Sequence, residues 1–168
     1  MDAKKFVDLF YPYAKQTHDK TGISPVAILA QAAIESGWGE HAPGNMFFGV
    51  KDSDGINGNE QLITTTEYHT RVDIKYPEVI SVTPCVINGV KKFKYRVKDY
   101  FRKYETPEEC FTDHAQFFFK NPRYHLALQF KSDALKFIDL ITIAGYATDP
   151  NYASTLKSIA KKIQGLLL

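Results

Sequence analysis

Between Ser24 and Gly37 the chain is apolar at nearly every position, which predicts a helix surrounded by other parts of the protein. Pro25 fits the first position of a helix that Ser24 caps, and Gly37 supplies the stop. Only Gln31 and Glu35 break the apolar pattern, and their spacing of four residues places them on one face.

A carboxyl group near the C-terminal end of a buried helix is disfavoured as an anion by desolvation and by the negative end of the helix dipole. Both effects raise its pKa, and a proton retained near neutral pH is what a general acid needs. Glu35 is therefore a candidate general acid. The same pattern also fits a glutamate that reaches the surface at a helix end and has no chemical role.

Other helices are predicted from hydrophobic spacing and capping residues. They cover residues 3–16, a segment from Thr106 to Asn121, residues 132–144, and a last helix capped at Asp149 that runs to residue 163.

The middle of the chain changes character and predicts a small antiparallel sheet of about three strands. Residues 62–68 are rich in threonine, which suits a strand. Residues 79–87 and 90–101 flank Asn88-Gly89, a strong hairpin signal. Pro84 lies inside the first hairpin arm and puts that arm at a sheet edge or a bulge. We expect one α+β domain, residues 1–168, mostly helical, with a β insertion at about residues 46–101 and a cleft between the lobes.

Composition narrows the class of protein. The chain has 168 residues, of which 44% are hydrophobic and 24% charged, as in an ordinary globular domain. A formal net charge of +2 is too small to argue for nucleic-acid binding, and ordinary solubility explains it better than attraction to an anionic cell wall.

No segment predicts a membrane span or a signal peptide. One disulfide between Cys85 and Cys110 is compatible with the sequence, but two reduced, buried thiols are the default expectation.

Five segments, in order, resemble the motifs of glycoside hydrolase family 73, the bacterial peptidoglycan N-acetylglucosaminidases that include flagellar hydrolases and autolysins. They are Glu35–Gly39, with the Ala-Gln-Ala-Ala-Ile that precedes it, Asn45–Lys51, Thr64–Tyr68, Tyr100–Tyr104 and Tyr146–Tyr152. The second segment departs from the family's usual Asn-Leu-Phe-Gly-Ile-Lys, because Met46 stands where that asparagine is expected.

The resemblance implies a lysozyme-like helical lobe with Glu35 as the acid, and it favours Glu67 as the second carboxylate that glycoside hydrolysis usually needs. Glu67 would activate water or stabilise positive charge, and inversion of configuration is the expected stereochemical course. Tyr146 matches a tyrosine that the family places in the active site, where it would hold the acetamido group or the water. The remaining candidates for substrate contact are Phe48, Gln31, Trp38 and Asn45.

The expected function is hydrolysis of peptidoglycan at N-acetylglucosaminyl β-1,4 bonds, by a monomer that acts in the periplasm or outside the cell. Glycan strands are the expected partner, with neither nucleic acid nor membrane insertion, and no metal or organic cofactor is implied. The export route and the biological role, such as phage lysin, secreted effector or autolysin, stay open.

Competing interpretations are a muramidase, a lytic transglycosylase, or a wall-binding module without activity. A cysteine peptidase that uses Cys110 and His114 is more distant, because such families bring these residues from different elements. A metallohydrolase is disfavoured, because the five histidines show no ligand spacing.

Overall fold

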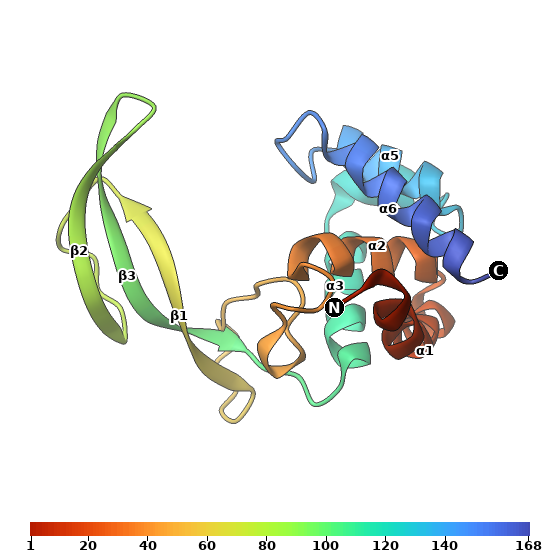
Figure 1. The fold of residues 1–168 in the computed structure, drawn as a ribbon, viewed down its shortest axis with the longest axis horizontal. Coiled ribbons are helices and arrows are strands. Elements are labelled where there is room, and N and C mark those ends of the chain that lie inside the picture. Colours follow the sequence, from red (N-terminus) through yellow and green to blue (C-terminus); the bar gives the residue numbers. More distant parts are fainter. The chain divides into compact units, whose positions relative to one another are not determined.

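A computed structural model describes all residues, 1–168, and divides them into two compact units. The helical unit comprises Met1–Phe48 and Tyr104–Leu168, and the sheet unit comprises Gly49–Lys103. Figure 1 shows the helices in the first unit and a twisted sheet in the second. The α+β class predicted from the sequence is confirmed.

The helical unit contains six α-helices. They are α1 (Ala3–Thr21), α2 (Pro25–Ser36), α3 (Pro107–Lys120), α4 (His125–Leu128), α5 (Ala134–Ile143) and α6 (Tyr152–Leu166). Two short 3-10 turns lie at Pro43–Asn45 and Pro122–Tyr124.

Helix α2 forms the centre of this unit. It packs against α1, α3, α5 and α6, and eight of its twelve residues are buried. The Ser24 side chain accepts a hydrogen bond from Ala27 N, and Gly37 ends the helix in the left-handed conformation, with φ 59°. The buried, capped helix predicted from the sequence is confirmed.

Two predicted helix starts are wrong by about two residues. Helix α5 begins at Ala134, where the Asp133 carboxylate accepts a hydrogen bond from Lys136 N. Asp149 does not cap α6, because its carboxylate accepts from Asn151 N in the turn before the helix. The four-residue α4 has too few residues to show a hydrophobic period, and the sequence did not predict it.

The sheet unit contains three antiparallel strands in the order β1-β3-β2. They are β1 (Glu60–His69), β2 (Glu78–Ile87) and β3 (Val90–Arg102). The predicted turn at Asn88-Gly89 is confirmed, with both residues at positive φ, 50° and 77°. Pro84 lies in the edge strand β2, as expected, and the register shifts between Val79 and Ser81.

Strand register gives the sheet two chemically different faces. Glu67 pairs with Tyr95, and Thr65 pairs with Val97, so these four side chains share one face, here called the Glu67 face. Tyr95 and Val97 are buried there, and the Tyr95 hydroxyl donates to Arg71 O at 2.9 Å. The opposite face carries alternate residues of β3, Lys92, Lys94, Arg96 and Lys98, and is here called the basic face.

Hydrogen bonds within the helical unit join the two points where the chain leaves it and returns. Tyr104 N donates to Gly44 O at 2.9 Å. Asn45 Nδ2 donates to the carbonyl oxygens of Tyr104 and Glu105, at 3.0 and 3.2 Å. We call these contacts the Asn45 clasp.

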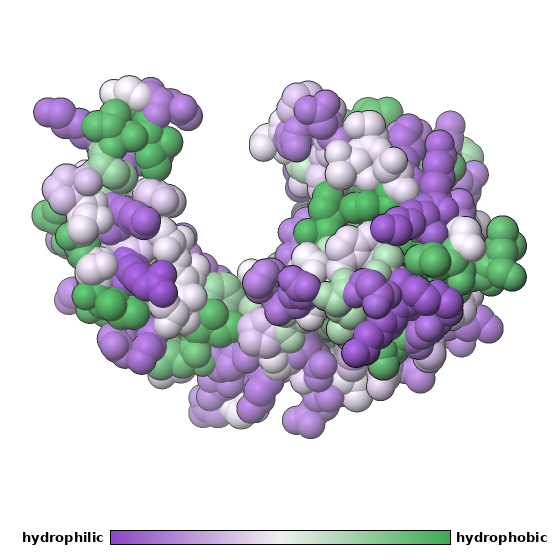
Figure 2. Space-filling view, viewed as in Figure 1, coloured by the Kyte–Doolittle hydropathy of each residue, from purple (hydrophilic) through white to green (hydrophobic).

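The surface over the β2–β3 hairpin mixes hydrophobic and hydrophilic residues (Figure 2). Val86 and Val90 are both exposed there. None of the helices is both long enough and apolar enough to span a bilayer.

The hairpin turn provides a test of the sheet register. Gly89→Ala forces an L side chain into φ 77° and should lower the free energy of unfolding by about 1–2 kcal/mol. Gly165→Ala in α6 is the matched control, because that glycine has ordinary φ and open space around it, and should raise stability by about 0.5–1 kcal/mol. Urea denaturation of both variants measures the difference, and equal effects would contradict the assigned turn.

Candidate active site

Glu35 is the penultimate residue of α2, one turn after buried Gln31. Its side chain is exposed to solvent, whereas most of the helix around it is buried. Even so, partial burial raises the pKa of the Glu35 carboxyl above its ordinary value. The structure thus confirms the expected direction of the shift, while leaving the carboxyl group accessible to a ligand from solvent.

Tyr146 follows α5 and lies close enough to Glu35 for the two groups to interact electrostatically. Burial raises the pKa of Tyr146 well above its usual range, and the Glu35 carboxylate adds to the effect. The Tyr146 hydroxyl forms a hydrogen bond with Nε2 of His114, 2.9 Å away. The Tyr146 ring packs on Phe118, with ring centroids 5.6 Å apart. Helix α3, which is distant in sequence, therefore holds this phenol in place near the carboxyl group.

His114 connects Tyr146 to Phe48. Its imidazole stacks on the Phe48 ring, with centroids 3.8 Å apart and an angle of 12° between the planes. Burial lowers the pKa of His114 to about 4, so the ring is neutral at pH 7. Phe48 thus has a clear packing partner, and its predicted contact with substrate remains a prediction.

Three buried polar atoms near this cluster form no hydrogen bond of good geometry, although Gln31 and Tyr146 both lie within hydrogen-bonding reach of the Tyr152 hydroxyl. They are Gln31 Nε2 and the hydroxyl oxygens of Tyr124 and Tyr152. Burial, with a smaller contribution from the Glu35 carboxylate, raises the pKa of Tyr152 to about 12. Buried polar groups without a well-formed hydrogen bond are rare in a folded interior. Gln31, predicted as a substrate contact, is itself almost fully buried, so its contact with substrate remains a prediction.

Glu67 lies on β1, and its side chain is about one third exposed. Lys51 Nζ lies 2.9 Å from Glu67 Oε1 and 2.9 Å from Asp99 Oδ2, so one ammonium group joins two carboxylates. Partial burial alone would lower the pKa of Lys51, but hydrogen bonds to both carboxylates raise it above its ordinary value. This ion-pair network fixes where the Glu67 carboxylate lies on its face of the sheet.

The other two predicted substrate contacts are occupied within the helical unit. Trp38 packs edge-on against Phe6, with centroids 5.5 Å apart, and Lys162 Nζ lies 5.2 Å from its ring centroid. Asn45 uses its amide group in the clasp. Both side chains have structural roles that the sequence motifs do not reveal.

Sequence reasoning assigned no role in the site to four residues that the structure places next to the candidates. They are Lys51, Asp99, His114 and Tyr152. Lys51 and Tyr152 end two of the family-like segments, which was a usable signal. The contacts of Asp99 and His114 depend on strand register and helix packing, and the local sequence does not encode either.

Cys110 does not have the environment of a nucleophile. Burial raises the pKa of its thiol to about 12, and its Sγ accepts a hydrogen bond from Phe47 N at 3.4 Å. Cys85 is likewise a free thiol. His114 is bonded to Tyr146 instead of activating Cys110. The structure thus speaks against the cysteine-peptidase interpretation, which requires a thiolate.

Known proteins resemble this chain over nearly its whole length. A family model described as mannosyl-glycoprotein endo-β-N-acetylglucosaminidase matches residues 11–165. Peptidoglycan hydrolase FlgJ of Vibrio parahaemolyticus is 31% identical over 169 residues, which cover 97% of this chain and 48% of that protein. Exo-glucosaminidase LytG of Bacillus subtilis is 28% identical, over 94% of this chain and 50% of that protein. The chain thus spans about half the length of these relatives.

A solved structure shares the fold. The C-terminally truncated glycoside hydrolase domain of Salmonella typhimurium FlgJ superposes with a TM-score of 0.72 at 33% identity, covering 98% of this chain and 99% of that domain.

The lowered pKa of His114 predicts acid sensitivity. An unfolded histidine binds a proton near pH 6.5, whereas folded His114 does so only near pH 4. The unfolded state therefore binds more protons between these values, and stability should fall as the pH drops from about 6.5 to 4, by up to about 1.4 kcal/mol per pH unit. His114→Gln, which cannot titrate, should flatten this slope in urea unfolding measured across the window. An unchanged slope would assign the acid sensitivity to other groups.

Proposed function

Because the chain belongs to the glucosaminidase family of glycoside hydrolases, we propose that it cleaves peptidoglycan glycan strands at N-acetylglucosaminyl β-1,4 bonds. The relatives named as peptidoglycan hydrolases and as a glucosaminidase support this substrate. We further propose that both compact units together make one catalytic domain, and that the protein works as a monomer on the cell wall, in the periplasm or outside the cell.

The observation that carries the proposal is the environment of Glu35. Its carboxyl group lies at the end of a buried helix, with a raised pKa, near the partly buried phenol of Tyr146. A carboxyl group that keeps its proton nearer to neutral pH can donate it to the glycosidic oxygen as the bond to the leaving sugar breaks. Glu35 is the general acid in this proposal.

Tyr146 and Gln31 are the proposed substrate-binding groups beside the acid. The Tyr146 hydroxyl is held in position by His114, and Gln31 Nε2 forms no hydrogen bond of good geometry, although it lies within reach of the Tyr152 hydroxyl. An acetamido group offers both a carbonyl acceptor and an N–H donor, so it can satisfy groups of this kind. We assign no substrate contact to Asn45 or Trp38, because their contacts within the helical unit account for them.

Glu67 is the proposed second carboxylate. It either activates water by accepting its proton or stabilises the positively charged sugar ring. The Lys51 ammonium group positions this carboxylate and also pairs with Asp99. The Glu67 side chain is therefore held by an ion pair and still remains partly exposed to solvent. Inversion of configuration, with Glu67 as the base, is the proposed course.

The alternative within the same chemistry is a muramidase or a lytic transglycosylase. A transglycosylase needs only one carboxyl group, because an internal hydroxyl of the sugar replaces water. The unsatisfied polar groups near Glu35 are compatible with either reaction, so the products must distinguish them.

Glu35→Gln should lower turnover by about 10²- to 10⁴-fold, because an amide cannot donate the proton, while the melting temperature stays near that of the unchanged protein. Mass spectrometry of fragments released from purified sacculi, after borohydride reduction, measures both rate and product. Reduced N-acetylglucosamine ends from the unchanged protein support the proposal. Reduced N-acetylmuramic acid ends, anhydro-muramic products or normal turnover by the variant would each contradict it.

Glu67→Gln should lower hydrolysis by about 10- to 1,000-fold without changing the product, because the amide keeps the shape of the side chain but cannot act as a base. Glu60→Gln, on the same strand, is the matched control and should retain full activity. Both variants are assayed on the same sacculi. If Glu67→Gln is as active as the control, a mechanism that uses a single carboxyl group replaces this one.

A further inference from the structure

The small net charge of the chain conceals a strong local concentration on one strand. Strand β3 carries six basic side chains and one acidic side chain, Asp99, in 13 residues. Four of the basic residues alternate along the strand and therefore share the basic face: Lys92, Lys94, Arg96 and Lys98. With about 6.7 Å between alternate residues, these cations form a row about 20 Å long.

The chain itself neutralises little of this row. Lys98 pairs with Glu78, with Nζ and Oε2 3.0 Å apart. Lys94 has only neutral neighbours across the sheet, Tyr68 and Thr83. The situation on the Glu67 face is the reverse, because there a single ammonium, that of Lys51, serves two carboxylates.

Arg96 is in the same situation as Lys94. Its cross-strand neighbours are Thr66 and Ser81, which carry hydroxyl groups and no charge. Arg96 and Lys94 are both exposed. Like charges aligned on one face repel one another, so an external anion that binds along the row gains attraction and relieves the repulsion.

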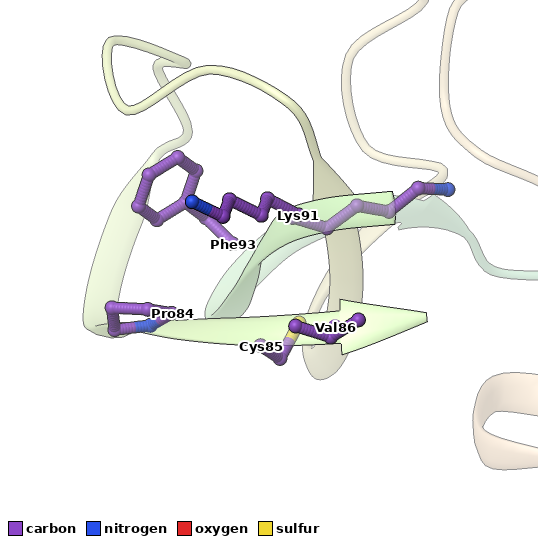
Figure 3. Close-up of a pocket in the computed structure, with 6 residues that line it drawn as sticks. Pro84, Cys85, Val86, Lys91 and Phe93 are labelled. Atoms are coloured by element: carbon purple, nitrogen blue, oxygen red, sulfur yellow. The ribbon is translucent and has the colours of Figure 1, made fainter. Parts of the chain in front are cut away.

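Lys92, the last cation of the row, also lines a pocket at the end of the hairpin. Pro84, Cys85 and Val86 of β2 and Lys91, Lys92 and Phe93 of β3 surround a hollow of about 380 Å³. Figure 3 shows these side chains gathered from both strands of the hairpin. Strand register assigns Cys85 and Lys92 to the basic face and the other four residues to the Glu67 face, so the pocket adjoins the row through Lys92 alone. Apolar atoms beside that ammonium group suit a ligand that carries a carboxylate next to a small apolar group.

We propose that the basic face binds the peptide stems of peptidoglycan through their free carboxylates. This inference rests on the proposed substrate, because peptidoglycan carries such stems along each glycan strand, with alanine methyl groups beside the carboxylates. The face lies on the opposite side of the sheet from Glu67, so it holds a neighbouring part of the polymer while the catalytic groups work elsewhere. The sheet unit thus anchors the enzyme to its insoluble substrate by multiple weak ionic contacts.

The test compares two variants that lose the same charge. One carries Lys92→Gln, Lys94→Gln and Arg96→Gln, and the control carries Lys5→Gln, Lys15→Gln and Lys161→Gln, all of them exposed on helices. Each is made in the non-cleaving Glu35→Gln background, and cosedimentation with purified sacculi measures affinity. The basic-face variant should bind at least tenfold more weakly than its parent, and the control should bind like the parent. Equal losses in both variants, or no loss in the first, would overturn the proposal.

Chemical modification of the wall identifies the ligand. Sacculi whose carboxylates are converted to amides with carbodiimide and glycinamide should bind the parent as weakly as untreated sacculi bind the basic-face variant. Raised salt should produce the same loss, because it screens exposed charges. Unchanged binding to the amidated wall, or tighter binding to DNA or anionic vesicles than to sacculi, would assign the face to another partner.

Cleavage assays on two substrates test the anchoring role separately from the proposed glycosidase activity. With Glu35 intact, the basic-face substitutions should slow the release of fragments from sacculi but not the cleavage of soluble glycan chains stripped of their peptides. Equal slowing on both substrates would contradict an anchoring role. Absence of any cleavage by the unchanged protein would reject the proposed function and leave the binding measurement standing.

Discussion

The burial of α2 is the constraint on which the candidate site depends. A helix so apolar is stable only when other elements cover it, and α1, α3, α5 and α6 supply that cover. The same packing brings Tyr146 and Tyr152 near the end of α2, because they flank the connection between α5 and α6. Assembly of the core and assembly of the chemical groups around Glu35 are therefore one event.

The polar cluster beside Glu35 lowers the stability of the folded protein, because it buries groups that water would otherwise solvate. Three of its polar atoms form no hydrogen bond of good geometry, and His114 is held neutral by its surroundings. Such costs are common where a protein prepares a site for a ligand rather than for its own stability. The Lys51 network on the Glu67 face is the opposite case, because its ammonium group and its two carboxylates pair with one another.

Local signals in the sequence were enough to predict α2 and the hairpin, and they also made Glu35 the candidate acid. Capping by Ser24, the Asn88-Gly89 turn and the apolar period act over a few residues, so they can be read without the fold. The predictions were wrong or missing where a contact joins residues that lie far apart in the sequence. No local pattern pairs His114 with Tyr146, 32 positions later, or brings Lys51 to Asp99. Asn45 shows the same limit, since its motif indicated a ligand contact and its amide closes a backbone junction.

The Asn45 clasp has a consequence for how this architecture can change during evolution. The clasp joins the two segments of the helical unit that flank residues 49–103. The insertion is therefore a loop whose two ends are fixed close together. Lengthening or shortening such a loop changes its closure entropy slowly, by about 0.6 kcal/mol for each doubling of length. Lineages can therefore exchange or remodel the whole insertion, and with it the basic face, while the helices inherit an unchanged core.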